Sequence, residues 1–304
     1  MNWSVVVPTI RPEQFRQFEK AWTPLFEKYN VDLIVVDDMP TPFRGGHLSQ
    51  RDVPSFIPRK TDMIRSWGFY KAWEKGSTDF ILTLDDDVVP YMDVFQEYQK
   101  EFEKGRPLSS YLSTGSLTTS GLEMRGFPYK DRSPKRVGIQ YGSWRGVLDY
   151  DAATQLSNPR KLEHFHPVNI QVPKGVPTTC CIMNCAFRVE NTPMMWQLPM
   201  LKGRYNRTGD IWSGLIQKKV LDHLGQVMMI NGKASVEHNR ASEPFNNLEK
   251  EQPGLKLNED LWENLEEGDF ETVADSAYRY FKKNDKEYAE HFRKCRDQWL
   301  ALFS

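Results

Sequence analysis

The sequence has few features that mark membrane, secreted or nucleic-acid-binding proteins. No apolar run approaches the roughly 20 residues that a helix needs to cross a bilayer, and the N-terminus lacks a basic segment followed by an apolar one. Lys and Arg total 40 against 41 Asp and Glu, so the net charge of −1 gives no overall attraction to nucleic acid or anionic lipid. We therefore expect a cytoplasmic protein with no membrane contact and no nucleic-acid partner.

Two further motifs are missing. The four cysteines, Cys180, Cys181, Cys185 and Cys295, show no CxxC spacing, which favours buried, reduced thiols over a zinc site. No GxGxxG follows an apolar strand pattern, so the sequence gives no support for a flavin-binding Rossmann unit.

The N-terminal part of the chain alternates between strand-like and helix-like patterns. Short apolar runs rich in Val, Ile and Leu alternate with segments whose aromatic residues recur every three or four positions. Strands are predicted at 3–8, 31–36 and 80–84, with helices at 12–29 and 61–75. This order predicts an α/β fold with a mainly parallel central sheet flanked by helices.

Polar residues follow the three predicted strands where each of them ends. Thr9 and Arg11 follow the first strand, Asp37 and Asp38 the second, and the run Asp85–Asp87 the third. Because ligands bind outside the carboxyl ends of the strands in open parallel sheets, we expect these side chains to gather at one binding edge.

Three adjacent carboxylates repel one another, and a divalent cation would remove that repulsion. Alternation along an extended chain would point Asp85 and Asp87 to the same side, where they could share manganese or magnesium. Such a cation also attracts phosphate oxygens. The alternative is a solvated acidic turn that only ends the strand.

Arg65 lies in the first part of the helix predicted at 61–75, and the small Gly68 lies three residues further on. A guanidinium at this position could bind a diphosphate through two hydrogen bonds. The alternative is an ordinary surface arginine.

These features resemble the GT-A fold of nucleotide-sugar-dependent glycosyltransferases, in which an acidic motif holds a metal that bridges a diphosphate. The rest of the chain contains a series of short motifs: 124–129 (MRGFPY), 149–156 (DYDAATQL), 172–175 (VPKG), 183–187 (MNCAF), 203–205 (GRY), 210–214 (DIWSG) and 238–245 (HNRASEPF). In these motifs and their order, the chain between about residues 3 and 250 resembles the reversibly glycosylated polypeptides, the UDP-arabinopyranose mutases best known from plants.

The resemblance implies roles for individual residues. The family's three-aspartate motif falls on Asp85–Asp87, and its reversibly glycosylated arginine falls on Arg125. Its later histidine, commonly a metal ligand or diphosphate contact in GT-A enzymes, falls on His238, and an acidic residue before a tryptophan falls on Asp210. The basic stretch from Lys130 to Gly142 is longer than the corresponding family loop.

Pyranose-to-furanose conversion requires the anomeric carbon to leave UDP, the ring to reopen and close, and UDP to return. A side chain that holds the sugar meanwhile would protect it from water. Arginine is a poor nucleophile because its guanidinium stays protonated, so Arg125 would need a nearby carboxylate, for which Asp149, Asp151 and Asp210 are candidates.

The sequence thus predicts a GT-A-like, nucleotide-sugar-binding catalytic domain at 1–250 and a C-terminal helical extension at 251–304 that packs on it. We expect a UDP-sugar mutase that interconverts UDP-arabinopyranose and UDP-arabinofuranose through a reversible glycosyl-arginine intermediate and uses a divalent metal, with manganese preferred and magnesium possible. Homo-oligomers are a further option. The alternatives are transfer of the sugar to an external acceptor, or a non-catalytic partner that glycosylates only itself. The predicted site residues are Asp85, Asp87 and His238 for metal, Thr9, Arg11, Asp37, Asp38, Arg65, Asp85 and Asp86 for the nucleotide-sugar, and Arg125, Asp151 and Asp210 for catalysis.

Overall fold

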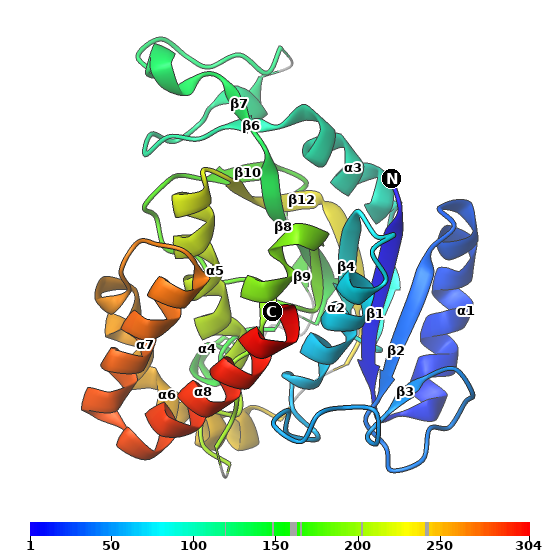
Figure 1. The fold of residues 1–304 in the computed structure, drawn as a ribbon. Coiled ribbons are helices and arrows are strands. Elements are labelled where there is room, and N and C mark those ends of the chain that lie inside the picture. Colours follow the sequence, from blue (N-terminus) through cyan, green and yellow to red (C-terminus); the bar gives the residue numbers. More distant parts are fainter. Residues whose placement is uncertain (119, 148, 159–162, 165, 202, 241–242) are drawn as a thin grey trace.

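A single large sheet organises the protein in the computed structural model, which describes residues 1–304 except 119, 148, 159–162, 165, 202 and 241–242. Among the described residues the sheet has ten strands, in the order β10-β12-β8-β11-β4-β1-β2-β3, with β5 paired to β12 and β9 to β8. Helices cover both of its faces (Figure 1). The predicted α/β class is confirmed.

The N-terminal half of the sheet matches the predicted pattern. Strands β1 (Trp3–Thr9), β2 (Asp32–Asp37) and β4 (Phe80–Leu84) lie parallel, with β1 in the middle. The two-residue β3 (Leu48–Ser49) pairs in parallel with the end of β2. Helix α1 (Pro12–Lys28) connects β1 to β2, and α2 (Ile64–Glu74) precedes β4. Because these strands are parallel, their carboxyl ends meet at one edge.

The C-terminal half makes the sheet mixed rather than mainly parallel. Strand β11 (Asn184–Arg188) runs antiparallel to both β4 and β8 (Val137–Gly146), while β12 (Val227–His238) runs parallel to β8. At the border, β10 (Asn169–Val172) is antiparallel to β12. The apolar pattern identifies strands but not their direction, which depends on how the long connections return to the sheet.

The remaining elements are β5 (Val88–Pro90), α3 (Val94–Lys104), β6 (Arg106–Pro107), η1 (Gly115–Leu117), η2 (Tyr129–Asp131), β7 (Pro134–Lys135), α4 (Ala152–Ser157), β9 (Glu163–His164), η3 (Val189–Met195), α5 (Gly209–Leu224), α6 (Pro244–Asn264), α7 (Phe270–Asn284), α8 (Lys286–Leu300) and η4 (Ala301–Phe303). No helix in the described part of the chain is both long and apolar enough to span a membrane.

Two apolar layers hold the helices to the sheet. Helices α1 and α3 pack on one face, where the α1 residues Phe15, Phe18 and Trp22 are buried. Helices α2, α5 and the C-terminal α6–α8 pack on the other face around Trp212. That tryptophan lies 5.2 Å from Phe281 of α7, measured between ring centroids, so the C-terminal helices belong to the same core as the sheet.

Helix α2 lies unusually close to the sheet because Gly68 has no side chain. A Cβ at position 68 would lie 2.4 Å from Cγ1 of Val6 and 2.9 Å from Cγ2 of Val36. This close approach brings the first turn of α2, which carries Arg65, next to the end of β4.

We predict that Gly68→Ala destabilises the protein by about 1–3 kcal/mol, although alanine is the better helix former, because the added methyl group would overpack two buried strands. The measurement is the free energy of unfolding in denaturant. Gly45→Ala is the control, since a Cβ there meets no atom within 4 Å, and its stability should stay within about 0.5 kcal/mol of the wild type. A Gly68→Ala protein as stable as the wild type would contradict the close packing.

Candidate functional site

The acid run forms a turn rather than the extended segment that the alternation argument assumed. Residues 86 and 87 lie in a turn between β4 and β5, and the amide of Val88 donates to the carbonyl of Asp85. The chain bends here so that β5 can pair antiparallel with the end of β12. The three carboxylates therefore meet different partners: Asp85 bonds with Arg65, Asp86 with Thr9 and Arg11, and Asp87 with Arg11 and Arg240.

Asp86 is the structural member of the run. Its carboxylate is 2% exposed and accepts hydrogen bonds from Thr9 Oγ1, at 2.6 Å, and from Nε and Nη2 of Arg11. Burial raises the pKa of Asp86, and the bonds from Thr9 and Arg11 oppose that rise. Thr9, Arg11 and Asp86, which the sequence predicted to bind the nucleotide-sugar, thus lie together, but their hydrogen bonds are made mainly with one another.

Asp87 is the member with an unused oxygen. Its Oδ2 atom accepts from Arg11 at 3.2 Å and from Arg240 at 3.3 Å. Its buried Oδ1 has no hydrogen-bond partner in the part of the chain that the structure describes, and it lies 3.8 Å from Nε2 of His238. The structure therefore brings together Asp87 and His238, two of the three predicted metal ligands.

The orientation of His238 fits a metal ligand. Its Nδ1 atom lies 2.7 Å from the carbonyl oxygen of Val147, which can only accept a hydrogen bond, so Nδ1 carries a proton. In the neutral ring, Nε2 is then left with a free lone pair on the side of Asp87. A bond from the second ring nitrogen to a carbonyl is the usual arrangement for metal-binding histidines.

Asp85 is held by Arg65, which is 3% exposed. Nη2 of Arg65 donates to Oδ1 of Asp85 at 2.6 Å, while Nη1 donates to Thr83 Oγ1 and to the carbonyl of Ile182. Neighbouring carboxylates raise the pKa of this guanidinium even though its burial acts to lower it. Arg65 thus lies behind Asp85 and positions that carboxylate, rather than presenting its two Nη groups to a diphosphate.

The two aspartates at the end of β2 have separate environments. Asp37 is fully buried, accepts from the amide of Phe43 at 2.8 Å and lies 3.7 Å from Nδ1 of His47, while its Oδ1 has no partner among the described residues. Asp38 accepts from the side chain of Gln50 and the amide of Lys60, so it fixes the loop that follows β2. Asp37 is the one with hydrogen-bonding capacity left.

A second group of carboxylates lies on the other side of Asp85. Asp62, Asp149 and Asp210 interact electrostatically with one another, Asp62 and Asp149 also interact with Asp85, and Asp62 and Asp210 interact with Arg65. Arg207 donates to Asp149 at 3.1 Å. Burial raises the pKa of Asp210 to about 7, and the charges of Asp62 and Asp149 contribute to the rise. Asp210 can therefore exchange protons near neutral pH.

Asp151 and Arg125 do not join the site. Asp151 is exposed and caps helix α4, where it accepts from the amide and hydroxyl of Thr154. Its pKa is lowered: partial burial acts upward, but the bonds from Thr154 outweigh it. Asp151 thus has a structural function at a helix end.

The segment 106–135, which carries the exposed Arg125, is attached at the far edge of the sheet. Its ends are the paired strands β6 and β7, and Gln171 Nε2 donates to Pro107 O beside the first residues of β12. His238 is the last residue of β12, which is irregular and lies opposite the ten residues of β8, so it spans about 30 Å. Figure 1 shows the segment projecting away from the end of β4. Within one chain, Arg125 and the acid run are separated.

Several site residues were missed from the sequence. Arg240 contacts Asp87, His47 lies beside Asp37, and Arg207 and Asp62 belong to the second acidic group. Arg240 lies inside the 238–245 motif, which was a usable signal. His47 and Asp62 lie in or next to a loop without periodicity, and only the folded chain shows what they contact.

No group of three or more His, Cys, Asp or Glu side chains is arranged around a common metal position within the ranges that the structure describes. Magnesium and manganese commonly take only one or two protein ligands and complete their shell with water and phosphate oxygens. In an octahedral shell with bonds of about 2.1 Å, neighbouring donors lie about 3.0 Å apart, so Asp87 Oδ1 and His238 Nε2, now 3.8 Å apart, would move under about 1 Å closer to share a cation. The carboxylate and imidazole are donors of the right kind for a cation that is shared with a phosphate ligand.

The fold and this edge define an α/β protein with an acidic, arginine-flanked site at the carboxyl ends of β1, β2 and β4. The sequence pattern of the family named "Reversibly glycosylated polypeptide" matches residues 118–282. The chain belongs to this family, as the motifs predicted.

The curated proteins that the chain resembles are named as UDP-arabinopyranose mutases. Probable UDP-arabinopyranose mutase 4 of Arabidopsis thaliana is 29% identical over 283 residues, covering 84% of this chain and 75% of the relative. UDP-arabinopyranose mutase 1 of Oryza sativa subsp. japonica is 28% identical with the same coverage. These relatives are named as isomerases, the predicted class of enzyme.

Solved structures resemble the chain only distantly. The catalytic domain of Drosophila β1,4-galactosyltransferase 7, in complex with xylobiose, matches with 13% identity and a TM-score of 0.38, covering 79% of this chain and 71% of that one. A197 from STIV matches with 10% identity and a TM-score of 0.35, covering 80% and 87%.

We predict that Asp210 makes a contribution to the free energy of unfolding that falls as the pH rises from about 4 to 7. With a folded pKa of about 7, this carboxyl keeps its proton in the native state after the unfolded chain has lost it near pH 4. The native state then binds more protons, so the free energy of unfolding decreases with pH in that window.

In Asp210→Asn this contribution is absent, so relative to the wild type the free energy of unfolding at pH 7, compared with pH 4, should be higher by on the order of 1–3 kcal/mol. Denaturant unfolding at several pH values measures the difference. Asp260→Asn, at an exposed aspartate of α6, is the control and should keep the wild-type slope. An unchanged slope in Asp210→Asn would contradict a protonated native Asp210.

Proposed function

We propose that the protein is a UDP-sugar mutase that interconverts UDP-arabinopyranose and UDP-arabinofuranose. Its family and the names of its relatives support this function. The single observation that carries the site is the unpaired Oδ1 of Asp87, 3.8 Å from His238 Nε2, at the end of β4. There a divalent cation and a diphosphate would both find partners.

Different side chains at the site would bind different parts of the UDP-sugar. Asp87 and His238 would hold the cation, with manganese preferred, and the guanidinium groups of Arg11 and Arg240 lie beside Asp87 where diphosphate oxygens would come. Asp37, buried with an unused oxygen, would accept a hydrogen bond from uridine. The bound cation would neutralise charge on UDP as the anomeric carbon leaves.

Proton transfer falls to the second group of carboxylates. Opening and closing a sugar ring moves a proton between the ring oxygen and a hydroxyl, and a group with a pKa near the working pH does this best. Asp210, with its pKa of about 7 and its electrostatic link through Asp62 and Asp149 to the acid run, is the candidate. Asp85, fixed by Arg65, lies between the two groups.

Because Arg125 and the acid run are separated within one chain, a glycosyl-arginine step would involve two copies of the chain. Arg125 is exposed but attached at the edge of the sheet opposite the acid run. For Arg125 to receive the sugar, it would have to come from a second copy whose 106–135 segment reaches the site. Homo-oligomerisation, an option at the sequence level, then becomes part of the mechanism.

Incubation with UDP-arabinopyranose and manganese tests the function. We expect UDP-arabinofuranose by chromatography, and a fall of at least about 100-fold in rate for Asp87→Asn, since this change removes a charged ligand of the cation. Asp260→Asn is the matched control and should retain activity. Sugar transfer to an added acceptor without isomerisation would favour a glycosyltransferase, and UDP-sugar binding without any product would favour a non-catalytic partner.

Mixing two variants tests whether Arg125 of one copy receives the sugar from the site of another copy. The Asp87→Asn chain keeps Arg125 but lacks a working site, and the Arg125→Ala chain keeps the site. Each alone should stay unmodified by intact-mass measurement after incubation with UDP-sugar. In the mixture, one sugar should appear on the Asp87→Asn chain only. If wild-type protein gains a sugar but the mixture does not, transfer between copies is wrong.

A further inference from the structure

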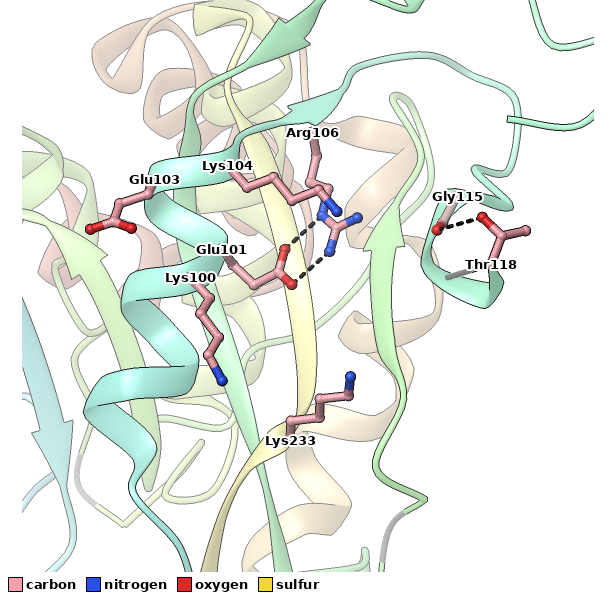
Figure 2. A pocket seen from close by; sticks show the side chains of 8 residues that line it. All are labelled: Lys100, Glu101, Glu103, Lys104, Arg106, Gly115, Thr118 and Lys233. Carbon is pink, nitrogen blue, oxygen red and sulfur yellow. Dashed lines mark hydrogen bonds and ion pairs between the residues drawn. The ribbon is translucent and has the colours of Figure 1, made fainter. Parts of the chain in front are cut away.

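A cavity of about 550 Å³ lies beside the second half of helix α3, away from the acid run (Figure 2). Phe102 of the same helical segment stacks on Phe80, the first residue of β4, with ring centroids 4.4 Å apart, whereas Asp85 follows the last residue of β4. The cavity is lined by Lys100, Glu101, Glu103, Lys104, Arg106, Gly115, Thr118 and Lys233. Four of these eight residues are cationic and two are acidic.

One ion pair forms the base of the cavity. Nε and Nη2 of Arg106 each donate to Glu101 at 2.6 Å, and Asn169 Nδ2 donates to the same carboxylate at 2.9 Å. Both members of the pair are less than 8% exposed. Glu101 is therefore fully engaged, while Nη1 of Arg106 makes no hydrogen bond within the described part of the chain. Figure 2 shows this third nitrogen pointing away from Glu101.

Two lysines add unpaired charge. Neither Lys104 of α3 nor Lys233 of β12 forms an ion pair or a side-chain hydrogen bond with any described residue, whereas Lys100 pairs with Glu97 at 2.5 Å. Figure 2 shows both lysine side chains directed toward Arg106. Lys104 also suits the C-terminal turn of a helix, but this explains neither Lys233 nor the free nitrogen of Arg106.

We propose that this cavity binds a small phosphate-bearing anion, of the size of pyrophosphate or a phosphorylated metabolite, between Lys104, Arg106 and Lys233. Arginine and lysine form strong, charge-assisted hydrogen bonds with phosphate oxygens. The volume lies within the range of about 300–1,000 Å³ typical of small-molecule sites. Such an anion would relieve the repulsion among three cationic groups that Glu101 alone cannot neutralise.

The bound anion would also connect two parts of the fold. Gly115 and Thr118 form one wall of the cavity and belong to the segment 106–135, while Lys104 and Lys233 belong to α3 and β12. Binding would thus link this segment to the sheet, independently of the proposed mutase activity.

Isothermal titration with inorganic pyrophosphate tests the proposal, in excess EDTA so that no cation can hold the probe at the acid run. We expect binding to one site, weakened at least about tenfold in the double variant Lys104→Ala/Lys233→Ala, or about 1.4 kcal/mol. The control Lys283→Ala/Lys286→Ala removes the same charge from exposed positions of α7 and α8 outside the cavity and should change the affinity less than about twofold. Circular dichroism and unfolding confirm that both variants fold.

Hydrogen exchange gives a second readout, because pyrophosphate should slow exchange of the amides at Gly115 and Thr118 in the wild type and not in the double variant. Absence of binding to the wild type, equal losses in the two double variants, or unchanged affinity in Lys104→Ala/Lys233→Ala would each overturn the proposal. The assay contains neither UDP-sugar nor metal, so its outcome does not depend on the mutase activity.

Discussion

The contact of Asp86 with Thr9 and Arg11 is the interaction on which the site depends. It joins the end of β4 to the end of β1 through a carboxylate that is only 2% exposed. With the middle aspartate fixed, the turn directs Asp85 toward Arg65 and Asp87 toward His238. Repulsion within the acid run is thus relieved mainly by arginines, and one oxygen, Oδ1 of Asp87, is left unpaired.

Charges of both signs are concentrated in this fold, in separate places. The acid run and the Asp210 group lie where β1, β2 and β4 end, and the lysine-rich cavity lies beside α3. Strand β12 contributes to both, with His238 at the acid run and Lys233 at the cavity. The net charge of −1 is therefore the sum of separate regions, one rich in carboxylates and one rich in lysine and arginine.

Much of the site could be predicted because the strands at 3–8, 31–36 and 80–84 have unambiguous apolar patterns and parallel strands share one carboxyl edge. The roles within the site were less predictable. Arg65 was expected to bind phosphate and instead holds Asp85, and Asp151 was expected in catalysis and instead caps α4. An isolated residue type does not show whether its hydrogen bonds are already used.

The sequence by itself determined the local elements, the α/β class and the edge where acidic residues gather, because periodicity and strand-end position are properties of neighbouring residues. The tertiary structure alone decided the antiparallel course of β11, the partners of each charged group and the separation of Arg125 from the acid run. The reason is physical: these features depend on contacts between residues far apart in the sequence, such as Arg11 with Asp86, 75 positions apart, and Asp87 with Arg240, 153 positions apart, and such contacts form only when the sheet assembles.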